Sequence, residues 1–391
     1  MTNIISTCLV IIIFLCCGYY WVIALAGVKK TSTILTIPPS FRFAITIPAH
    51  DEEKVIGQTI NRLKHQNYPH ELFDVFVVAD FCSDKTAQIA RDEGAICFER
   101  NSGERGQKGI ALQWLFGQLN KIDRQYDAIV VFDADTSVDE NFLGYMNSRI
   151  SEGDKVIQGK HIISNPEDGR MQAFSWAMMT IDNRFSNQGR ANLHLSAKNM
   201  GDSICYKTDV IRCLGFGKGL TEDYQFRYRL LLNNIRIKYE PSAIGYGQAS
   251  MSIKSAQQQH SRWRKGTMEA SAHFRKQALI EGIIRKNPAL LDAAVASSIP
   301  AYSTLTLVTI LVLLIHICLA RFFSPILTYL WGGITFLWFL YPLFGLFLEN
   351  SPTWAYSAIL SGPIFILWRS WLVIKLRLSP HTVTWIRTPH K

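Results

Sequence analysis

The chain has 391 residues, 48% of them hydrophobic, and a formal net charge of +10. This length is too great for one small domain. The positive charge is consistent with nucleic acid, anionic lipid headgroups or phosphorylated substrates, but we attribute it to a positive-inside bias of cytoplasmic surfaces. The sequence has no dense tract of Lys and Arg, so we predict no nucleic-acid partner. Its eight cysteines include no Cys-x-x-Cys pair, which argues against a zinc site and a disulfide framework. The apolar residues gather at both ends of the chain.

The first apolar run predicts a transmembrane helix within residues 1–30. Residues 4–28 contain no charged side chain, and about 20 such residues cross a bilayer. A signal peptide is the alternative, because residues 24–26 resemble a cleavage site, but no Lys or Arg precedes the run. Lys29 and Lys30 follow directly, and the positive-inside rule then places the next domain in the cytoplasm.

Residues 40–285 alternate between short apolar runs and amphipathic segments. We expect the first run to end at Pro48 and a helix to begin near Glu52. Such strand–helix–strand repetition predicts an α/β domain with a mostly parallel, Rossmann-like sheet. The runs that predict buried strands are residues 43–47, 73–79 and 128–132.

Four carboxylates follow these predicted strands directly: Asp51, Asp80, Asp133 and Asp135. Ligands of open α/β sheets bind at the carboxyl ends of the strands. Acidic groups gathered at one edge repel one another, so a cation or the donor groups of a nucleotide would stabilise them. A single one of these residues is equally consistent with a helix cap or a turn.

Asp133 and Asp135 form a D-x-D motif behind a buried strand. Two carboxylates separated by one small residue suit Mg²⁺ or Mn²⁺, which complete their coordination with phosphate oxygens. We therefore expect a divalent metal, bound together with a phosphorylated substrate.

Three further segments carry candidate site residues. Glu222 and Asp223 are candidates for a general base, although first-turn acids after Thr221 also fit helix capping. Lys108 begins a predicted helix and is either a phosphate contact or a solvated side chain. The third segment lies in a basic, aromatic stretch that fits diphosphate and sugar binding or an interfacial helix, and it contains Gln259, Arg262 and Trp263.

The C-terminal part predicts two more transmembrane helices, at residues 299–320 and 325–348. The next apolar stretch, 354–376, contains Arg369, which is costly inside a bilayer. We expect residues 354–391 to form an interfacial helix and a cytoplasmic tail. With three spans, the basic residues of this tail obey the positive-inside rule: Lys375, Arg377, Arg387 and Lys391. The chain is thus expected to be an integral protein of a bacterial plasma membrane.

Taken in order, these motifs resemble the inverting glycosyltransferases of family 2, which have the GT-A fold. That family includes cellulose, chitin and hyaluronan synthases and ceramide glucosyltransferase. The resemblance spans residues 43–263 and the flanking apolar segments. The matching motifs are residues 47–53 (IPAHDEE), 77–84 (VVADFCSD), 133–135 (DAD), 221–223 (TED) and 259–263 (QHSRW).

The resemblance implies roles for particular residues. Asp80 would contact the nucleotide base, Asp133 the ribose and metal, and Asp135 the metal. Asp223 would be the catalytic base, with Glu222 beside it. The remaining implied donor-binding residues are Pro48, Asp51, Lys108 and Arg262, and those at the diphosphate and acceptor end are Gln259, Arg262 and Trp263. Two positions depart from the pattern: Gln107, where relatives often have Gly, and Gln248, where they often have an acid.

The resemblance implies metal-dependent, inverting transfer of a sugar from a nucleotide-sugar donor, with a UDP-sugar favoured. The acceptor is expected to be lipid-linked or a polysaccharide, with membrane lipids as further partners. A processive synthase of the hyaluronan or cellulose type is one alternative, and a sugar nucleotidyltransferase is another. A catalytically silent membrane scaffold is an alternative of a different class, and a transporter fits least, because His316 is the only ionisable residue in the clear spans. The oligomeric state is left open.

Overall fold

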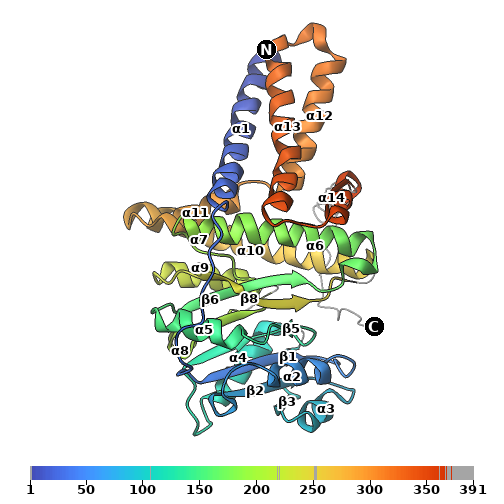
Figure 1. The fold of residues 1–391 in the computed structure, drawn as a ribbon. Coiled ribbons are helices and arrows are strands. Elements are labelled where there is room, and N and C mark those ends of the chain that lie inside the picture. Colours follow the sequence, from blue (N-terminus) through green and yellow to red (C-terminus); the bar gives the residue numbers. More distant parts are fainter. Residues whose placement is uncertain are drawn as a thin grey trace. The chain divides into compact units, whose positions relative to one another are not determined.

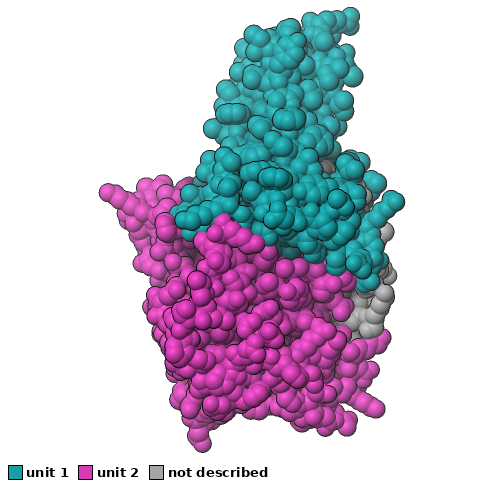
Figure 2. Space-filling model, viewed as in Figure 1, with its two compact units in different colours: residues 1–29, 166–193, 295–381 teal, residues 30–165, 194–294, 382–391 magenta. Residues whose placement is uncertain are grey.

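The computed structural model describes residues 2–105, 107–217, 219, 221–250, 253–360, 362–365, 367 and 371. The chain divides into two compact units (Figure 2). Unit 1 combines residues 1–29, 166–193 and 295–381, and unit 2 combines residues 30–165, 194–294 and 382–391. Arg369 and the predicted basic tail lie outside the described residues, so the expected side of the tail stays a prediction.

Unit 2 contains a sheet of eight strands in the order β3-β2-β1-β4-β7-β6-β8-β5. Strands β1, β2, β3 and β4 pair in parallel, as do β6 and β8, whereas β7 pairs antiparallel with β4 and β6, and β5 with β8. The predicted α/β domain with a mostly parallel sheet is therefore confirmed, and the structure adds the antiparallel pairs that make the sheet mixed. The strands are β1 Phe43–Ala49, β2 Phe73–Asp80, β3 Ile96–Arg100, β4 Ala128–Val131, β5 Ser137–Val138, β6 Val156–Ile163, β7 Ile204–Lys207 and β8 Lys238–Gly247.

The central strands are buried because their side chains are apolar on both faces. β4 is buried at every residue, and β1 at all but Pro48. The prediction that β1 ends at Pro48 is wrong, since the strand pairs with β2 through Ala49. Proline lacks the N–H that a ladder uses, but Pro48 lies beyond Thr46, the last residue of β1 that pairs with β4, so β1 has a partner on one side only at this position, as an edge strand has. The following helix also begins later than predicted, at Ile56.

Helices pack around this sheet and make up the rest of the regular structure described in unit 2 (Figure 1). Its described helices are α2 Ile56–Lys64, α3 Thr86–Asp92, α4 Lys108–Leu119, α5 Phe142–Ser151, α8 Thr208–Leu214, α9 Glu222–Leu232 and α10 Ile253–Ile284, with the short η1 His70–Leu72. The first seven residues of α11, Pro288–Ser298, belong to this unit as well. There α11 buries Leu290 and Ala293 against Tyr228 of α9 and Ala278 of α10.

Unit 1 holds the apolar helices. Among the described residues, two helices are long and apolar enough to cross a membrane, α1 Thr2–Ala26 and α13 Pro325–Leu348. A third candidate arises only if α11 and α12 (Tyr302–Cys318) count as one broken span. The predicted span at 299–320 is therefore shorter than expected, because Pro300 precedes the helix and η4 (Ala320–Phe322) follows it. α1, α12 and α13 lie side by side as a bundle (Figure 1).

Five more helical segments lie in the described part of unit 1. Helix α6 (Arg170–Asp182) continues through a π-helical segment, η3 (Asn183–Gly189), into α7 (Arg190–Asn192). The others are α14 (Thr353–Leu360) and the short η2 (Pro166–Asp168). Apolar side chains of α6 and η3 pack with those of α1, α13 and α14. An ion pair between Arg184 and Glu349, 3.4 Å apart, joins η3 to the end of α13.

Glycines allow α1 and η3 to approach closely. A Cβ atom on Gly189 would lie 2.1 Å from the carbonyl oxygen of Ile23, and one on Gly27 would lie 2.5 Å from that of Arg184. Both contacts are with backbone, which has little freedom to move away. Small residues at such crossings let membrane helices pack backbone to backbone.

Replacing Gly189 with Ala is expected to destabilise unit 1. The added methyl group cannot be accommodated without a backbone shift, and overpacking of this kind costs about 1–3 kcal/mol. The measurement is the thermal unfolding of the purified chain in detergent or nanodiscs. Gly18→Ala in α1 is the matched control, since nothing lies within 4 Å of a Cβ there. Equal unfolding temperatures for the two variants would contradict the close approach.

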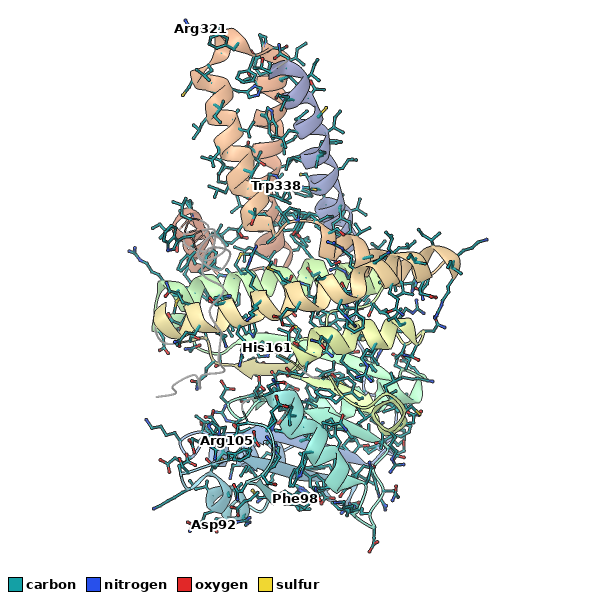
Figure 3. The ribbon with its side chains drawn as sticks, turned by 180° about the vertical axis from the view of Figure 1, so that it is seen from behind. Asp92, Phe98, Arg105, His161, Arg321 and Trp338 are labelled. Carbon is teal, nitrogen blue, oxygen red and sulfur yellow. The ribbon has the colours of Figure 1, made fainter. Side chains whose placement is uncertain are left out.

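A buried polar cluster also joins the three helices of the bundle. The Ser6 hydroxyl lies 2.8 Å from His316 Nε2 and accepts a hydrogen bond of 3.1 Å from Trp331 Nε1. His316 is thus a packed, hydrogen-bonded residue of a helical bundle. The same bundle contains Trp338, one of the largest fully buried side chains (Figure 3).

Candidate active site

The site lies in unit 2 at the carboxyl ends of β1, β2 and β4. These strands are parallel neighbours, so their ends meet at one edge of the sheet. The sequence places Asp51 two residues after β1, Asp80 at the end of β2, and Asp133 two residues after β4. The predicted gathering of these acids at one edge is therefore observed, but they form two groups with different partners.

Asp80 belongs to the first group and is held by Arg100. Its Oδ1 lies 2.5 Å from Arg100 Nε, and both side chains are buried. Arg100 also donates to the carbonyl oxygens of Ser102 and Glu104. Arg100 was not predicted from the sequence, because it closes the next strand, β3, and only the parallel pairing of β2 with β3 brings it opposite Asp80. One carboxylate oxygen of Asp80 is thus fixed by protein.

Asp51 organises the loop that follows β2. Its residue has a left-handed backbone with φ of 55°, and its carboxylate accepts hydrogen bonds from the N–H and hydroxyl of Ser83. Asp84 accepts from the N–H groups of Glu53 and Thr86. Asp51, Cys82 and Asp84 offer ligand atoms within 4.8 Å of one another. Since backbone donors already engage both carboxylates, this cluster is best explained as the support of the loop.

The second group is centred on Lys108 and Asp133. The Lys108 ammonium, at the start of α4, contacts the Asp133 carboxylate and donates to the carbonyl oxygen of Gly201 at 2.6 Å. Burial alone would lower the pKa of Lys108, but the nearby carboxylates of Asp133, Glu222 and Asp202 raise it. Lys108 is therefore a permanently charged cation among acids.

Asp202 supports the D-x-D turn and was not predicted. Its Oδ1 accepts hydrogen bonds from the N–H of Asp133 (3.0 Å) and the hydroxyl of Thr136 (3.1 Å). Its Oδ2 lies 2.7 Å from Nδ1 of His161, a residue of β6 (Figure 3). Burial alone would lower the pKa of His161, yet the contact with Asp202 raises it. The pair is therefore a buried histidine–carboxylate contact that fixes the turn.

The surroundings of Asp135 oppose its ionisation. Burial, together with the negative charges of Asp133 and Asp202, raises the pKa of Asp135 to about 7. A cation bound between Asp133 and Asp135 would offset this repulsion, and two carboxylates are the oxygen ligands that Mg²⁺ and Mn²⁺ prefer. The donor set thus fits a divalent metal. Asp135 also lines a small cavity of about 50 Å³ that includes Gln248.

Glu222 and Asp223 begin α9 and face the same group. A Cβ atom on Gly201 would lie 3.2 Å from Asp223 Oδ2, and one on Gly109 would lie 2.7 Å from Glu222 Cβ. Burial and the neighbouring Asp223 charge raise the pKa of Glu222 to about 7, and burial raises that of Asp223. The acids are therefore tightly enclosed, and their elevated pKa values suit proton transfer near neutral pH.

The predicted capping role of Thr221 is not observed, since its side chain makes no cap hydrogen bond. Its buried hydroxyl has no hydrogen-bond partner among the described residues. Gly266 of α10 closes over it, because a Cβ there would lie 2.6 Å from the Thr221 oxygen. The start of α9 is therefore packed against α10.

That packing brings the first turns of α10 to the acids. Arg262 lies near enough to Glu222 to lower the pKa of that carboxyl in part, and its buried Nε has no hydrogen-bond partner within the described chain. Gln259 accepts a hydrogen bond of 3.2 Å from Ser250, and Trp263 is 42% exposed. A buried guanidinium N–H without a partner suits an anionic ligand, which would satisfy it.

Of the predicted site residues, the structure thus brings together Lys108, Asp133, Asp135, Glu222, Asp223 and Arg262. Asp51 and Asp80 lie at the neighbouring strand ends with their own partners, and Pro48 lies within β1. Gln259 and Trp263 lie on the same stretch of α10 as Arg262.

Comparison with known proteins gives consistent matches to sugar transferases. Residues 38–266 match the family described as "Glycosyltransferase like family 2". The chain is 25% identical over 245 residues to the probable glycosyltransferase YdaM of Bacillus subtilis, covering 60% of this chain and 57% of that protein. It is 24% identical over 236 residues to the poly-beta-1,6-N-acetyl-D-glucosamine synthase of Staphylococcus epidermidis, covering 57% and 54%.

A further match is named for a glycolipid product. The beta-monoglucosyldiacylglycerol synthase of Trichormus variabilis is 25% identical over 233 residues, covering 57% of this chain and 48% of that protein. The chain thus spans about half the length of the curated relatives that it matches.

Among solved structures, the mannosyltransferase PcManGT of Pyrobaculum calidifontis, in complex with GDP-Man and Mn²⁺, is similar with a TM-score of 0.53. The match covers 88% of this chain and 97% of that one at 15% sequence identity, which shows a shared fold. The match over residues 38–266, together with the sheet and its acidic edge, establishes that the chain belongs to glycosyltransferase family 2.

Proposed function

We propose that this chain transfers a sugar from a nucleotide-sugar donor to a hydroxyl group of a lipid-linked or polysaccharide acceptor, with inversion at the anomeric carbon. The observation that carries the proposal is the convergence of Lys108, Asp133, Glu222, Asp223 and Arg262. Four separate segments supply these residues, and they form one partly buried group of two cations and three acids. Such a group has no evident structural purpose, because like charges in close burial destabilise a fold.

The proposed reaction is a single displacement. The acceptor oxygen attacks the anomeric carbon as the bond from that carbon to the diphosphate oxygen breaks, and the nucleoside diphosphate leaves. Asp223 takes the proton of the acceptor hydroxyl, and burial, which raises the pKa of Asp223, makes it a better base. Lys108 and Arg262 stabilise the charge on the diphosphate. A divalent cation held by Asp133 and Asp135 would supply further neutralisation of the leaving group.

The donor's nucleoside end is assigned to the strand ends of β1 and β2. Asp80 keeps one oxygen free of Arg100 for the base, and Asp51 holds the loop around it. We favour a UDP-sugar. We also propose that unit 2 faces the cytoplasm of a bacterial cell, because Lys29 and Lys30 follow α1. Membrane lipids then surround the apolar helices of unit 1.

Two kinds of acceptor are compatible with the proposed transfer. One relative is named for a polysaccharide product and another for a glycolipid product. We favour a lipid-linked acceptor over processive synthesis, since the described chain offers at most three candidate spans to line an export channel. A polymer ladder in place of a single addition would reverse this preference.

The test is a donor panel with the full chain in nanodiscs. UDP- and GDP-sugars are supplied with Mn²⁺ or Mg²⁺ and membrane lipid extract, and both nucleoside diphosphate release and product mass are measured. We expect one donor class to be consumed, with loss of activity in EDTA. Release of pyrophosphate from a nucleoside triphosphate and a sugar phosphate would instead identify a nucleotidyltransferase. Failure with every donor, or unchanged cellular function of an Asp223→Asn variant, would favour a silent scaffold.

A further inference from the structure

A second cavity of unit 2 contains none of the residues assigned to sugar transfer. It has a volume of about 270 Å³ and lies where α10 ends and α11 begins. Its lining includes His194, Asn234, Arg236, Arg285, Lys286 and Asn287. Three of these residues are permanently charged cations, so the cavity is suited to an anion.

The charges around this cavity are only partly balanced. Arg285 Nε lies 2.6 Å from the carboxylate of Glu281, which is the only acidic group paired with these cations within the described chain. Arg236 donates to the carbonyl oxygen of His194 at 2.6 Å, which orients its guanidinium without neutralising it. Lys286 is exposed. The positive end of the α11 dipole also faces this corner, since the helix begins at Pro288.

An apolar face of α10 leads directly to the cavity. Leu279, Ile280, Ile283 and Ile284 are 43%, 44%, 62% and 70% exposed. On the opposite side of the helix, Ala278 is buried and a Cβ on Gly282 would lie 2.9 Å from Leu291. Soluble surfaces normally show large apolar side chains singly, whereas here four lie within two turns of one helix. Apolar residues next to basic ones are typical of helices that lie on a membrane.

The path of the chain favours the bilayer as the occupant of this surface. After Lys286 the chain forms α11 and then enters α12, a helix of the apolar unit, at Tyr302. We propose that the cavity and the apolar face of α10 together bind an anionic phospholipid at the bilayer surface. Arg236, Arg285 and Lys286 hold its phosphate, and an acyl chain lies along Ile280, Ile283 and Ile284. This inference does not depend on the proposed transferase activity.

The experiment is site-specific photo-crosslinking of the full chain in nanodiscs. Ile284 is replaced by p-benzoylphenylalanine, and lipid adducts are counted by mass spectrometry in discs of phosphatidylcholine alone or with phosphatidylglycerol. Ile96 on β3, an isoleucine of unit 2 that is 43% exposed where Ile284 is 70% exposed, carries the probe in the control. We expect adducts at position 284 that favour phosphatidylglycerol, and background yield at position 96.

Charge variants test whether crosslinking depends on binding of the lipid headgroup or only on apolar contact with the acyl chain. Arg236→Gln and Lys286→Gln are each expected to lower the phosphatidylglycerol adduct at position 284 by about fivefold. Lys64→Gln and Lys121→Gln, at exposed sites elsewhere in the same unit, should leave it unchanged. Equal yields with both lipids, protein–protein adducts without lipid, or complete displacement of the lipid by millimolar inorganic phosphate would each overturn the proposal.

Discussion

The Asp223→Asn variant is expected to lose about 10²–10⁴-fold in kcat, because an amide cannot accept the acceptor's proton. Donor binding should persist, since Lys108, Asp133 and Arg262 remain in place. The measurement is nucleoside diphosphate release at saturating donor, together with a separate titration of donor binding. A fall in donor affinity with unchanged kcat would assign Asp223 to binding and contradict its role as the base.

The chain contains a closely matched control for this variant. Asp209 also lies in the first turn of a helix, and its Oδ1 accepts the N–H of the next residue at 2.8 Å, as Asp223 does from Tyr224. Asp209 is exposed and does not contact the group around Lys108. Asp209→Asn should therefore retain nearly full activity. Equal losses in both variants would indicate damage to helix capping and not to proton transfer.

The second large effect is expected from Asp202→Asn. This change removes the negative charge that pairs with His161 and supports the D-x-D turn. Breaking a buried ion pair from one side costs about 3–5 kcal/mol. Loss of a group that orients metal ligands typically weakens metal binding by about 10–100-fold. The measurements are chemical unfolding and Mn²⁺ binding by electron paramagnetic resonance, so neither depends on turnover.

Two control variants test whether the effect of Asp202→Asn comes from the buried position of Asp202 and not from an Asp→Asn change as such. Asp127 also accepts a backbone N–H, from Arg42 at 2.8 Å, but it is exposed. Asp127→Asn should shift the free energy of unfolding by less than about 0.5 kcal/mol. If Asp202→Asn fails to fold, Thr136→Val removes only the 3.1 Å hydrogen bond to Asp202 and leaves the ion pair. Unchanged Mn²⁺ affinity in that variant and in Asp202→Asn would refute the supporting role.

The parallel half of unit 2 could be predicted from the sequence. Three runs are nearly continuously apolar and therefore predict strands buried on both faces: residues 43–47, 73–79 and 128–132. Parallel pairing of these strands then places the acids that follow them at one edge of the sheet. The predicted end of β1 at Pro48 and the predicted start of α2 near Glu52 were wrong, because both rested on the local conformational preferences of single residues. The pairing with β2 continued the strand, and the tight loop at Asp51 delayed the helix.

The antiparallel half of the sheet contains site residues that the sequence did not predict. Asp202 precedes β7 and His161 lies on β6, and neither stands in a recognisable motif. Their contact depends on the register between these strands and on the loop before β7, which a single sequence does not encode locally. Arg100 was missed for the same reason on the other side of the sheet. The only guide to these residues in the sequence was the general rule that a buried carboxylate needs a charged or hydrogen-bonding partner.

The hydrogen bonds of Ser6 have a consequence for how the protein is made. Their partners, His316 and Trp331, are translated only after more than three hundred further residues. During that interval α1, a candidate membrane span, holds a hydroxyl whose hydrogen-bond partners have not yet been synthesised. The bundle of α1, α12 and α13 can therefore close only after residues 30–294 of unit 2 have been translated, and a chain that stops before Trp331 would lack this hydrogen bond.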